Sequence, residues 1–225
     1  MDIVTKVENL NKKYKLNNSN GLSNNSSINY ILIYGNIPIL LSAPHAVKQI
    51  RNGEEKAEDA NTGGITEYLC NACKSYGIIR NYNKLDDPNN DNFGFGLEYK
   101  NKILDFIKEN NIKLVLDIHG CNNSHNFDFC LGTNNRKNLN GQYEILNILS
   151  SDLSTIGKVA IDEYFKASLD GNISKYISAN SNIPSIQIEI SNKYRKDEEY
   201  LEQLISCLQI TIENINKRCL NTKNN

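Results

Sequence analysis

The chain has 225 residues, which is the size of one domain. Its 25 Lys and Arg residues nearly balance its 26 Asp and Glu residues, and this balance excludes a strongly basic arm for nucleic acid and a polyacidic tail. No apolar run approaches the roughly 20 residues of a membrane-spanning helix, and the N-terminus lacks the layout of a signal peptide. Six cysteines without an export signal suggest reduced thiols. We therefore expect a cytoplasmic protein that binds neither nucleic acid nor a membrane.

The first part of the chain is expected to form strands around a polar loop. Ile3–Val7 and Ile28–Tyr34 have strand character, and the turn-rich segment Asn17–Ser27 lies between them. A buried strand is expected at Ile37–Ser42. It is followed by a helix that runs from Thr62, its candidate cap, to about Lys74.

Strands and helices continue to alternate after residue 74. Gly77–Tyr82 looks like a strand, and Phe93–Lys108 looks like a helix that turns Leu97, Leu104 and Ile107 inward. The later apolar runs of strand length are Ile112–Ile118, Phe127–Leu131, Lys158–Ile161 and Ser185–Ile190. Apolar strands without alternation suit a sheet that is covered on both faces, so the pattern predicts a three-layer α/β/α domain.

The clearest helix begins after Asp197, which is a good N-terminal cap. Its apolar residues recur every three or four positions, at Leu201, Leu204, Ile205, Leu208, Ile212 and Ile215. This periodicity is lost after about Lys217. We therefore expect one domain over residues 1–217 and a frayed tail over residues 218–225.

Two of the three histidines lie where an open α/β sheet binds its ligands. His45 follows the strand Ile37–Ser42, and His119 ends the apolar run that begins at Lys113. Glu189 places a carboxylate inside a third apolar run, where a charge is costly unless it is paired, metal-bound or catalytic.

Two imidazoles and one carboxylate, with an open position for water, make up a catalytic zinc site. Asp59 is the best candidate for the third ligand because it shortly precedes the helix start at Thr62, and Glu58 is the alternative. A single histidine at a strand end is more often structural, so the prediction rests on the coincidence at three separate strands. Zinc is expected, although manganese, iron and cobalt also suit these ligands.

The same residues stand in short blocks whose order resembles the N-formylglutamate amidohydrolase-like family, which is related to poly-γ-glutamate hydrolase and the zinc carboxypeptidases. The blocks, between about Ile37 and Arg195, are Pro44-His45-Ala46, Arg51, Lys56, Asp59-Ala60-Asn61-Thr62-Gly63, Asp87-Pro88-Asn89, Asp117-Ile118-His119-Gly120, Gln187-Ile188-Glu189-Ile190 and Tyr194-Arg195. The chain departs from the short His-x-x-Glu ligand pair of the carboxypeptidases, because Lys48 occupies that offset from His45.

The resemblance implies a phosphorylase/hydrolase-like fold with a mixed sheet and a zinc-dependent hydrolase of an amide bond. By that resemblance, His45, Asp59 and His119 match the metal ligands, Glu189 matches the carboxylate that activates water, and Asn89 matches a substrate contact. The expected substrate is an N-acyl amino acid similar to N-formylglutamate, or a small acidic peptide. The alternatives are a γ-glutamyl or cell-wall metallopeptidase, and a member of the same fold that binds a metal or a ligand without catalysis.

Three further side chains are candidates for the site. A guanidinium can hold a carboxylate through two parallel hydrogen bonds or stabilise a tetrahedral oxyanion, so Arg51 and Arg195 are candidate anion receptors for the substrate. Asp117 lies two residues before His119 and therefore on the same side of the strand, where it could orient the imidazole. The third histidine, His125, falls in a polar loop and is expected to be exposed.

Overall fold

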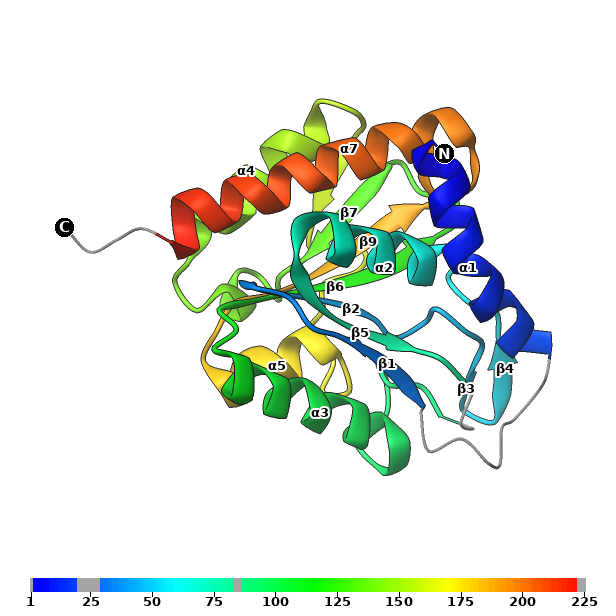
Figure 1. Ribbon diagram of the computed structural model, residues 1–225. Coiled ribbons are helices and arrows are strands. Elements are labelled where there is room, and N and C mark those ends of the chain that lie inside the picture. The colour runs from blue at the N-terminus through cyan, green and yellow to red at the C-terminus, as the bar shows by residue number, and fades with distance from the viewer. Residues whose placement is uncertain (1, 20–28, 83–85, 222–225) are drawn as a thin grey trace.

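The structure, a computed structural model, describes residues 2–19, 29–82 and 86–221 and contains a mixed sheet of seven strands (Figure 1). Across the sheet the strands follow the order β1, β5, β2, β6, β9, β7, β8. Their bounds are Tyr30–Ile33 (β1), Ile37–Ala43 (β2), Ser75–Arg80 (β5), Leu114–Cys121 (β6), Phe129–Gly132 (β7), Val159–Ile161 (β8) and Ser185–Ser191 (β9). A separate hairpin pairs β3, Gln49–Arg51, with β4, Glu54–Lys56.

The centre of the sheet is parallel and its edges are antiparallel to it. Strands β5, β2, β6 and β9 run in one direction, whereas β1 pairs antiparallel with β5 and β7 pairs antiparallel with β9. The carboxyl ends of β2, β6 and β9 therefore meet at one edge of the sheet, which is where open α/β folds bind their ligands.

Helices cover both faces of the sheet (Figure 1). One face carries α1 (Ile3–Ser19), α2 (Thr62–Cys73), α4 (Tyr143–Ser154) and α7 (Glu198–Ile215), and the other carries α3 (Gly94–Asn110) and α5 (Ile173–Ser181). Ile39 and Leu41 of β2 pack in the core under α2 and α7, and Leu40 between them packs in the core on the α3 side. The expected three-layer α/β/α fold around a mixed sheet is confirmed.

The first expected strand is wrong, because Ile3–Val7 begins the helix α1. Val7, Asn11 and Tyr14 recur at helical spacing and are all buried, and α1 packs against α2 along this stripe. The polar segment expected over residues 17–27 begins inside this helix, and its remainder from residue 20 lies outside the described residues.

Two details of the expected helices also differ. The residue that precedes α2 is Asn61, in a left-handed conformation, and Thr62 is the first helical residue, with its hydroxyl donating to the carbonyl oxygen of Asp59. In α3 the buried face is formed by Tyr99, Ile103 and Phe106 with Ile107, whereas Leu97 and Leu104 are only partly buried.

The C-terminal helix is as expected but continues further. The side chain of Asp197 accepts from the backbone N–H groups of Glu199 and Tyr200, and the six predicted apolar positions of α7 are buried. The expected loss of structure after residue 217 is wrong for residues 218–220, because a further helical turn, Asn216–Leu220, buries Leu220 in the core. Residues 222–225 lie outside the described part. Among the described residues, no helix combines the length and the apolarity that crossing a membrane requires.

Candidate functional site

The two predicted histidines meet at the carboxyl edge of the sheet. His45 lies in the turn directly after β2, and His119 lies near the end of the neighbouring strand β6. Their rings are edge to face with centroids 4.7 Å apart, and both side chains are almost completely buried. The two strand ends thus bring together residues that are 74 positions apart in the sequence.

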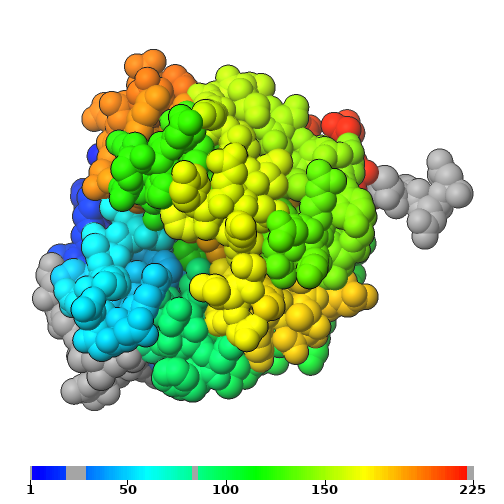
Figure 2. All heavy atoms as spheres, turned by 180° about the vertical axis from the view of Figure 1, so that it is seen from behind, coloured from blue at the N-terminus to red at the C-terminus, as the bar shows by residue number. Residues whose placement is uncertain are grey.

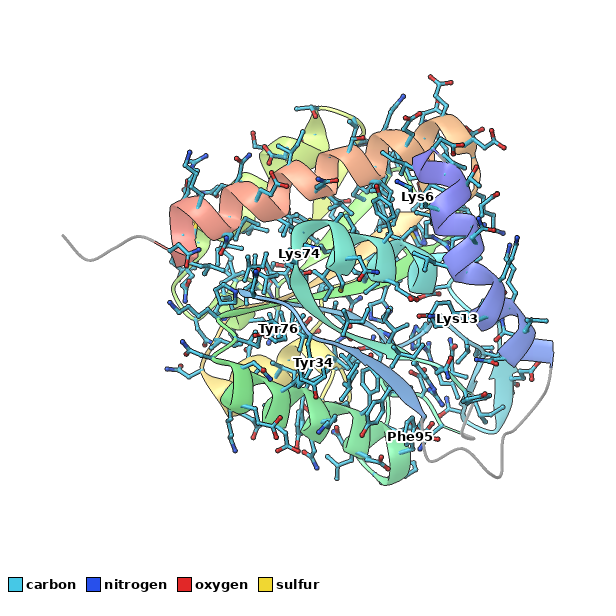
Figure 3. The ribbon with its side chains drawn as sticks, in the orientation of Figure 1. Lys6, Lys13, Tyr34, Lys74, Tyr76 and Phe95 are labelled. Carbon is cyan, nitrogen blue, oxygen red and sulfur yellow. The ribbon has the colours of Figure 1, made fainter. Side chains whose placement is uncertain are left out.

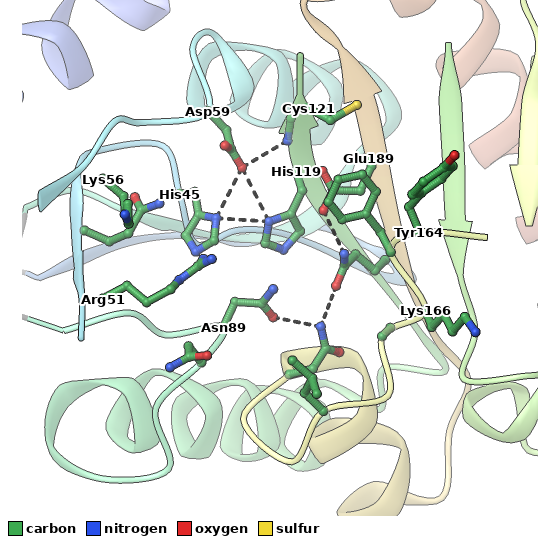
Figure 4. A pocket seen from close by; sticks show the side chains of 18 of the residues that line it. His45, Arg51, Lys56, Asp59, Asn89, His119, Cys121, Tyr164, Lys166 and Glu189 are labelled. Atoms are coloured by element: carbon green, nitrogen blue, oxygen red, sulfur yellow. Dashed lines mark hydrogen bonds and ion pairs between the residues drawn. The ribbon is translucent and has the colours of Figure 1, made fainter. Parts of the chain in front are cut away.

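Asp59 completes a triangle with the two imidazoles (Figure 4). Its Oδ2 lies 3.2 Å from Nδ1 of His45 and 3.4 Å from Nδ1 of His119, and the two Nδ1 atoms are 3.2 Å apart. Asp59 is held there because its backbone N–H donates to the carbonyl oxygen of His45 and its Oδ2 accepts from the N–H of Gly120. Glu58, the alternative ligand, is not part of this group.

The far side of each imidazole is bound by a carboxylate. Nε2 of His45 lies 2.8 Å from Asp87, and Nε2 of His119 lies 2.8 Å from Asp117. A carboxylate only accepts hydrogen bonds, so each Nε2 must carry a proton. In the neutral ring each Nδ1 then presents a lone pair, and the triangle is formed by three acceptors that face one another. Such a group requires a shared cation, either protons or a metal ion.

The charges around the triangle shift the pKa values of all three of its side chains. Burial alone would lower the pKa of the two imidazoles, but Asp87 beside His45 and Asp117 beside His119 outweigh burial and raise both pKa values above the ordinary 6.5. Burial opposes ionisation of Asp59, yet the hydrogen bonds with both histidines outweigh it and lower its pKa. The site therefore retains positive charge that a metal ion can replace.

Asp117 lies where the sequence predicted an acceptor for a ligand imidazole, and Asp87 has the same position behind His45. Sequence reasoning gave Asp87 no role at the site, because it lies in a loop 42 residues from His45. The only signal was its place in the Asp87-Pro88-Asn89 block. Asp87 also accepts from Nε of Arg51 at 2.6 Å, so one carboxylate joins the histidine to a cation at the cavity wall.

Glu189 lies beside the triangle on β9. It is opposite His119 in the parallel register of β6 and β9, and its side chain is buried. Burial raises the pKa of Glu189 to about 7, so the group exchanges a proton readily at neutral pH. Its Oε1 accepts from Nε2 of Gln187 at 2.8 Å, and Oε1 of Gln187 in turn accepts from Asn172, which also donates to Asn89.

A cavity of about 740 Å³ opens onto these residues. It is lined by His45, Asp59, His119 and Glu189 together with Arg51 and Lys56. In Figure 2 its mouth lies between the cyan residues around 50–60 and the yellow residues around 165–175. The two imidazoles and the two carboxylates thus face a cavity that is large enough for a small molecule.

Of the three residues predicted to bind substrate, two line the cavity and one does not. Arg51 lines the cavity and its side chain is 40% exposed, and Asn89 lines it as well. Arg195 is 3% exposed and does not line the cavity. Its guanidinium donates to the carbonyl oxygens of Ile190, Ala60 and Cys121 and to the side chain of Asn192. Arg195 therefore ties strand ends and the Asp59 loop together, and the expectation that it binds substrate is wrong.

Comparisons with known proteins identify the fold. No family model and no curated protein sequence matches the chain. The crystal structure of an N-formylglutamate amidohydrolase from Ralstonia eutropha matches with a TM-score of 0.64 and 13% identity, over 84% of this chain and 97% of the other. A bacteriophage poly-gamma-glutamate hydrolase matches with a TM-score of 0.53 and 13% identity, over 87% of this chain and 93% of the other. The chain therefore has the mixed-sheet α/β/α fold of these hydrolases, as the sequence resemblance implied.

Proposed function

We propose that this protein is a zinc-dependent hydrolase that cleaves an amide bond. The observation that carries the proposal is the triangle of three acceptor atoms, from His45, Asp59 and His119, with edges of 3.2–3.4 Å. Ligands at ~2.0–2.1 Å from a tetrahedral zinc ion are roughly 3.3–3.4 Å from one another. Two imidazoles and one carboxylate also leave a fourth position for water or substrate, as catalytic zinc sites do.

The surroundings of the triangle fit the same ion. Metal-binding histidines almost always donate their other N–H to a carboxylate or a carbonyl group, which is the arrangement of His45 with Asp87 and of His119 with Asp117. When bound, zinc supplies a Lewis acid that polarises a carbonyl group and lowers the pKa of water to about 7. Other divalent transition metals suit the same ligands.

Glu189 is the proposed general base. It takes a proton from the attacking water, whose oxygen forms a bond with the amide carbon, and it returns that proton to the nitrogen as the C–N bond breaks. The products are a carboxylic acid and an amine. A pKa of about 7 suits both halves of this transfer, and the hydrogen bond from Gln187 fixes the orientation of the carboxylate.

The substrate is proposed to be an N-acyl acidic amino acid or a small acidic peptide. Arg51 and Lys56 give one wall of the cavity two positive charges that can bind a carboxylate. Asn89 also lines the cavity and adds a side-chain amide. The likeness of fold to an N-formylglutamate amidohydrolase makes an N-acyl glutamate the first compound to test, and γ-glutamyl peptides are the second.

The proposal is tested by metal content and hydrolysis on the same preparations. We expect the purified protein to bind one zinc ion and to hydrolyse an N-acyl glutamate, and a chelator to abolish the activity until zinc is restored. His45→Ala and His119→Ala should each lose the metal. His125→Ala is the matched control, because His125 lines the same cavity outside the triangle.

Two results would contradict the proposal. Full metal content in His45→Ala or His119→Ala would mean that the ligands are misassigned. Bound metal without hydrolysis of any acyl-glutamate or glutamyl peptide would favour a binding protein of the same fold.

A further inference from the structure

The cavity has two chemically different walls on opposite sides of the histidine pair. Figure 4 shows Arg51 and Lys56 on one side of His45 and His119, and Tyr164 and Lys166 on the other. The first wall is the β3–β4 hairpin. Gln49 and Lys56 are opposite each other in its register, and Arg51 follows Gln49 by two residues, so alternation gives all three the same face.

The second wall, the aromatic wall, comes from the loop after β8 and also carries Lys166. Tyr164, Phe165 and Leu169 line the cavity there, and Tyr164 and Leu169 are 63% and 71% exposed. The ring of His125 is stacked on Phe127 at 5.0 Å and lies 5.1 Å from the ring of Tyr164. His125, which the sequence predicted to be an exposed polar residue, is therefore half-buried in an aromatic cluster.

This loop is held in place by hydrogen bonds to the segment after β7. Asp162 accepts from the backbone N–H of Thr133 at 2.6 Å and from that of Asn135 at 3.1 Å. The carbonyl oxygen of Lys166 accepts from the N–H of Asn134 at 2.6 Å, and that of Ala167 accepts from Asn138 at 3.1 Å. The exposed side chains of Tyr164 and Leu169 are thus presented on a fixed backbone, which lowers the entropic cost of binding a ligand.

We propose that the cavity selects amides that join an acidic residue to a ring-bearing group, with the carboxylate on the Arg51 and Lys56 wall and the ring on Tyr164 and Leu169. This inference rests on the proposed function and specifies its substrate. A formyl group has one carbon and no ring, so it offers no apolar surface to Tyr164 and Leu169. Exposed apolar side chains that converge at the mouth of a polar cleft indicate a partner, and a ring gains stacking and apolar burial there.

The ring can be attached on either side of the bond that is cleaved, and two compounds separate these cases. N-benzoyl-L-glutamate carries the ring on the acyl side, and γ-L-glutamyl-anilide carries it on the amine side. N-formyl-L-glutamate and L-glutamine are the matched compounds without a ring. We expect kcat/KM for at least one ring-bearing compound to exceed that for its ring-free match by about tenfold, the size of one good aromatic contact.

The variant Tyr164→Ala tests whether the aromatic wall is responsible. It should abolish the preference for the ring and leave kcat/KM for the ring-free compounds within about twofold. Tyr143→Ala is the control, because Tyr143 is also half exposed but begins α4 and does not line the cavity. No preference for either ring-bearing compound, or a preference that survives Tyr164→Ala, would overturn the proposal.

Binding measured by calorimetry keeps this inference separate from the proposed function. In the Glu189→Gln background, which should bind without turnover, the ring-bearing compounds should have a Kd about tenfold lower than the ring-free ones, and Tyr164→Ala should remove the difference. If no compound is hydrolysed but the preference in Kd is found, the hydrolase assignment fails and the subsite stands. If hydrolysis occurs without preference, the subsite fails alone.

Discussion

Replacement of Glu189 by Gln is the most direct test of the proposed chemistry. The change is isosteric, and the new side-chain carbonyl oxygen can still accept from Nε2 of Gln187, which donates to Glu189 at 2.8 Å. We therefore expect little change in thermal stability. The general base, however, is lost, because an amide cannot take a proton from water.

The expected loss follows from what else lines the cavity. General acid–base catalysis contributes about 10²–10⁴-fold to a rate. Among the described residues that line the cavity, the only other carboxylate is Asp59, and it is bound to both histidines. No second free carboxylate lines the described part of the cavity, so we expect a loss near the upper end, about 10³–10⁴-fold in kcat, or roughly 4–5.5 kcal/mol.

The assay compares kcat, KM and bound zinc for the wild-type protein, Glu189→Gln and Glu163→Gln. Glu163 is an exposed carboxylate in the loop that forms the aromatic wall and does not line the cavity, so its replacement should change nothing. Zinc content should be unchanged in both variants. A Glu189→Gln protein that retains more than about a tenth of the wild-type kcat would refute Glu189 as the base.

Three further predictions concern the metal and the fold. Asp87→Asn should weaken zinc binding about 10–100-fold, as measured against a competing chelator, because Asp87 holds Nε2 of His45; an unchanged affinity would contradict this role. Zinc affinity should also fall as the pH is lowered, and the fall should begin above pH 6.5 because the pKa values of both imidazoles are raised. A ring that is protonated at both nitrogens has no lone pair to bind the metal. A constant affinity between about pH 8 and pH 6 would argue against histidine ligands. Gly120→Ala should destabilise the protein by about 3 kcal/mol in urea unfolding, since a Cβ there would lie 2.3 Å from Cζ of the buried Arg195; a loss under about 1 kcal/mol would show that Arg195 can move.

Some of the site could be predicted because strand ends are readable in a sequence. Apolar runs of strand length ended at or just before His45 and His119 and enclosed Glu189, and a parallel sheet brings such ends to one edge. The prediction that Asp59 joins the two histidines depended in addition on the path of its loop, which returns to the strand ends. The sequence favoured Asp59 and kept Glu58 as the alternative, and in the structure the carboxylate that meets both imidazoles and the N–H of Gly120 is that of Asp59.

Other contacts depend on the folded chain alone. Arg195 carries a charge that suits a substrate carboxylate, but its direction is decided by the packing of α6 (Asn192–Lys196) against the strand ends, where carbonyl oxygens occupy its guanidinium. The sequence singled out Asp87 only as part of the Asp87-Pro88-Asn89 block and did not connect it with His45, because nothing local to a loop encodes a contact across 42 residues. Local patterns also misled at Ile3–Val7, where β-branched residues suggested a strand but the buried stripe against α2 favours a helix.

The sequence by itself determined the layered α/β/α architecture and both histidines of the triangle, because hydrophobic periodicity and strand ends are local properties of the chain. It also favoured Asp59 over Glu58 as the third acceptor. The tertiary structure alone decided that Asp87 holds the imidazole of His45, that Arg51 rather than Arg195 lines the cavity, and where the aromatic wall stands. These depend on the paths of loops between distant elements, and the free energy that selects those paths comes from contacts that form only when the sheet has assembled.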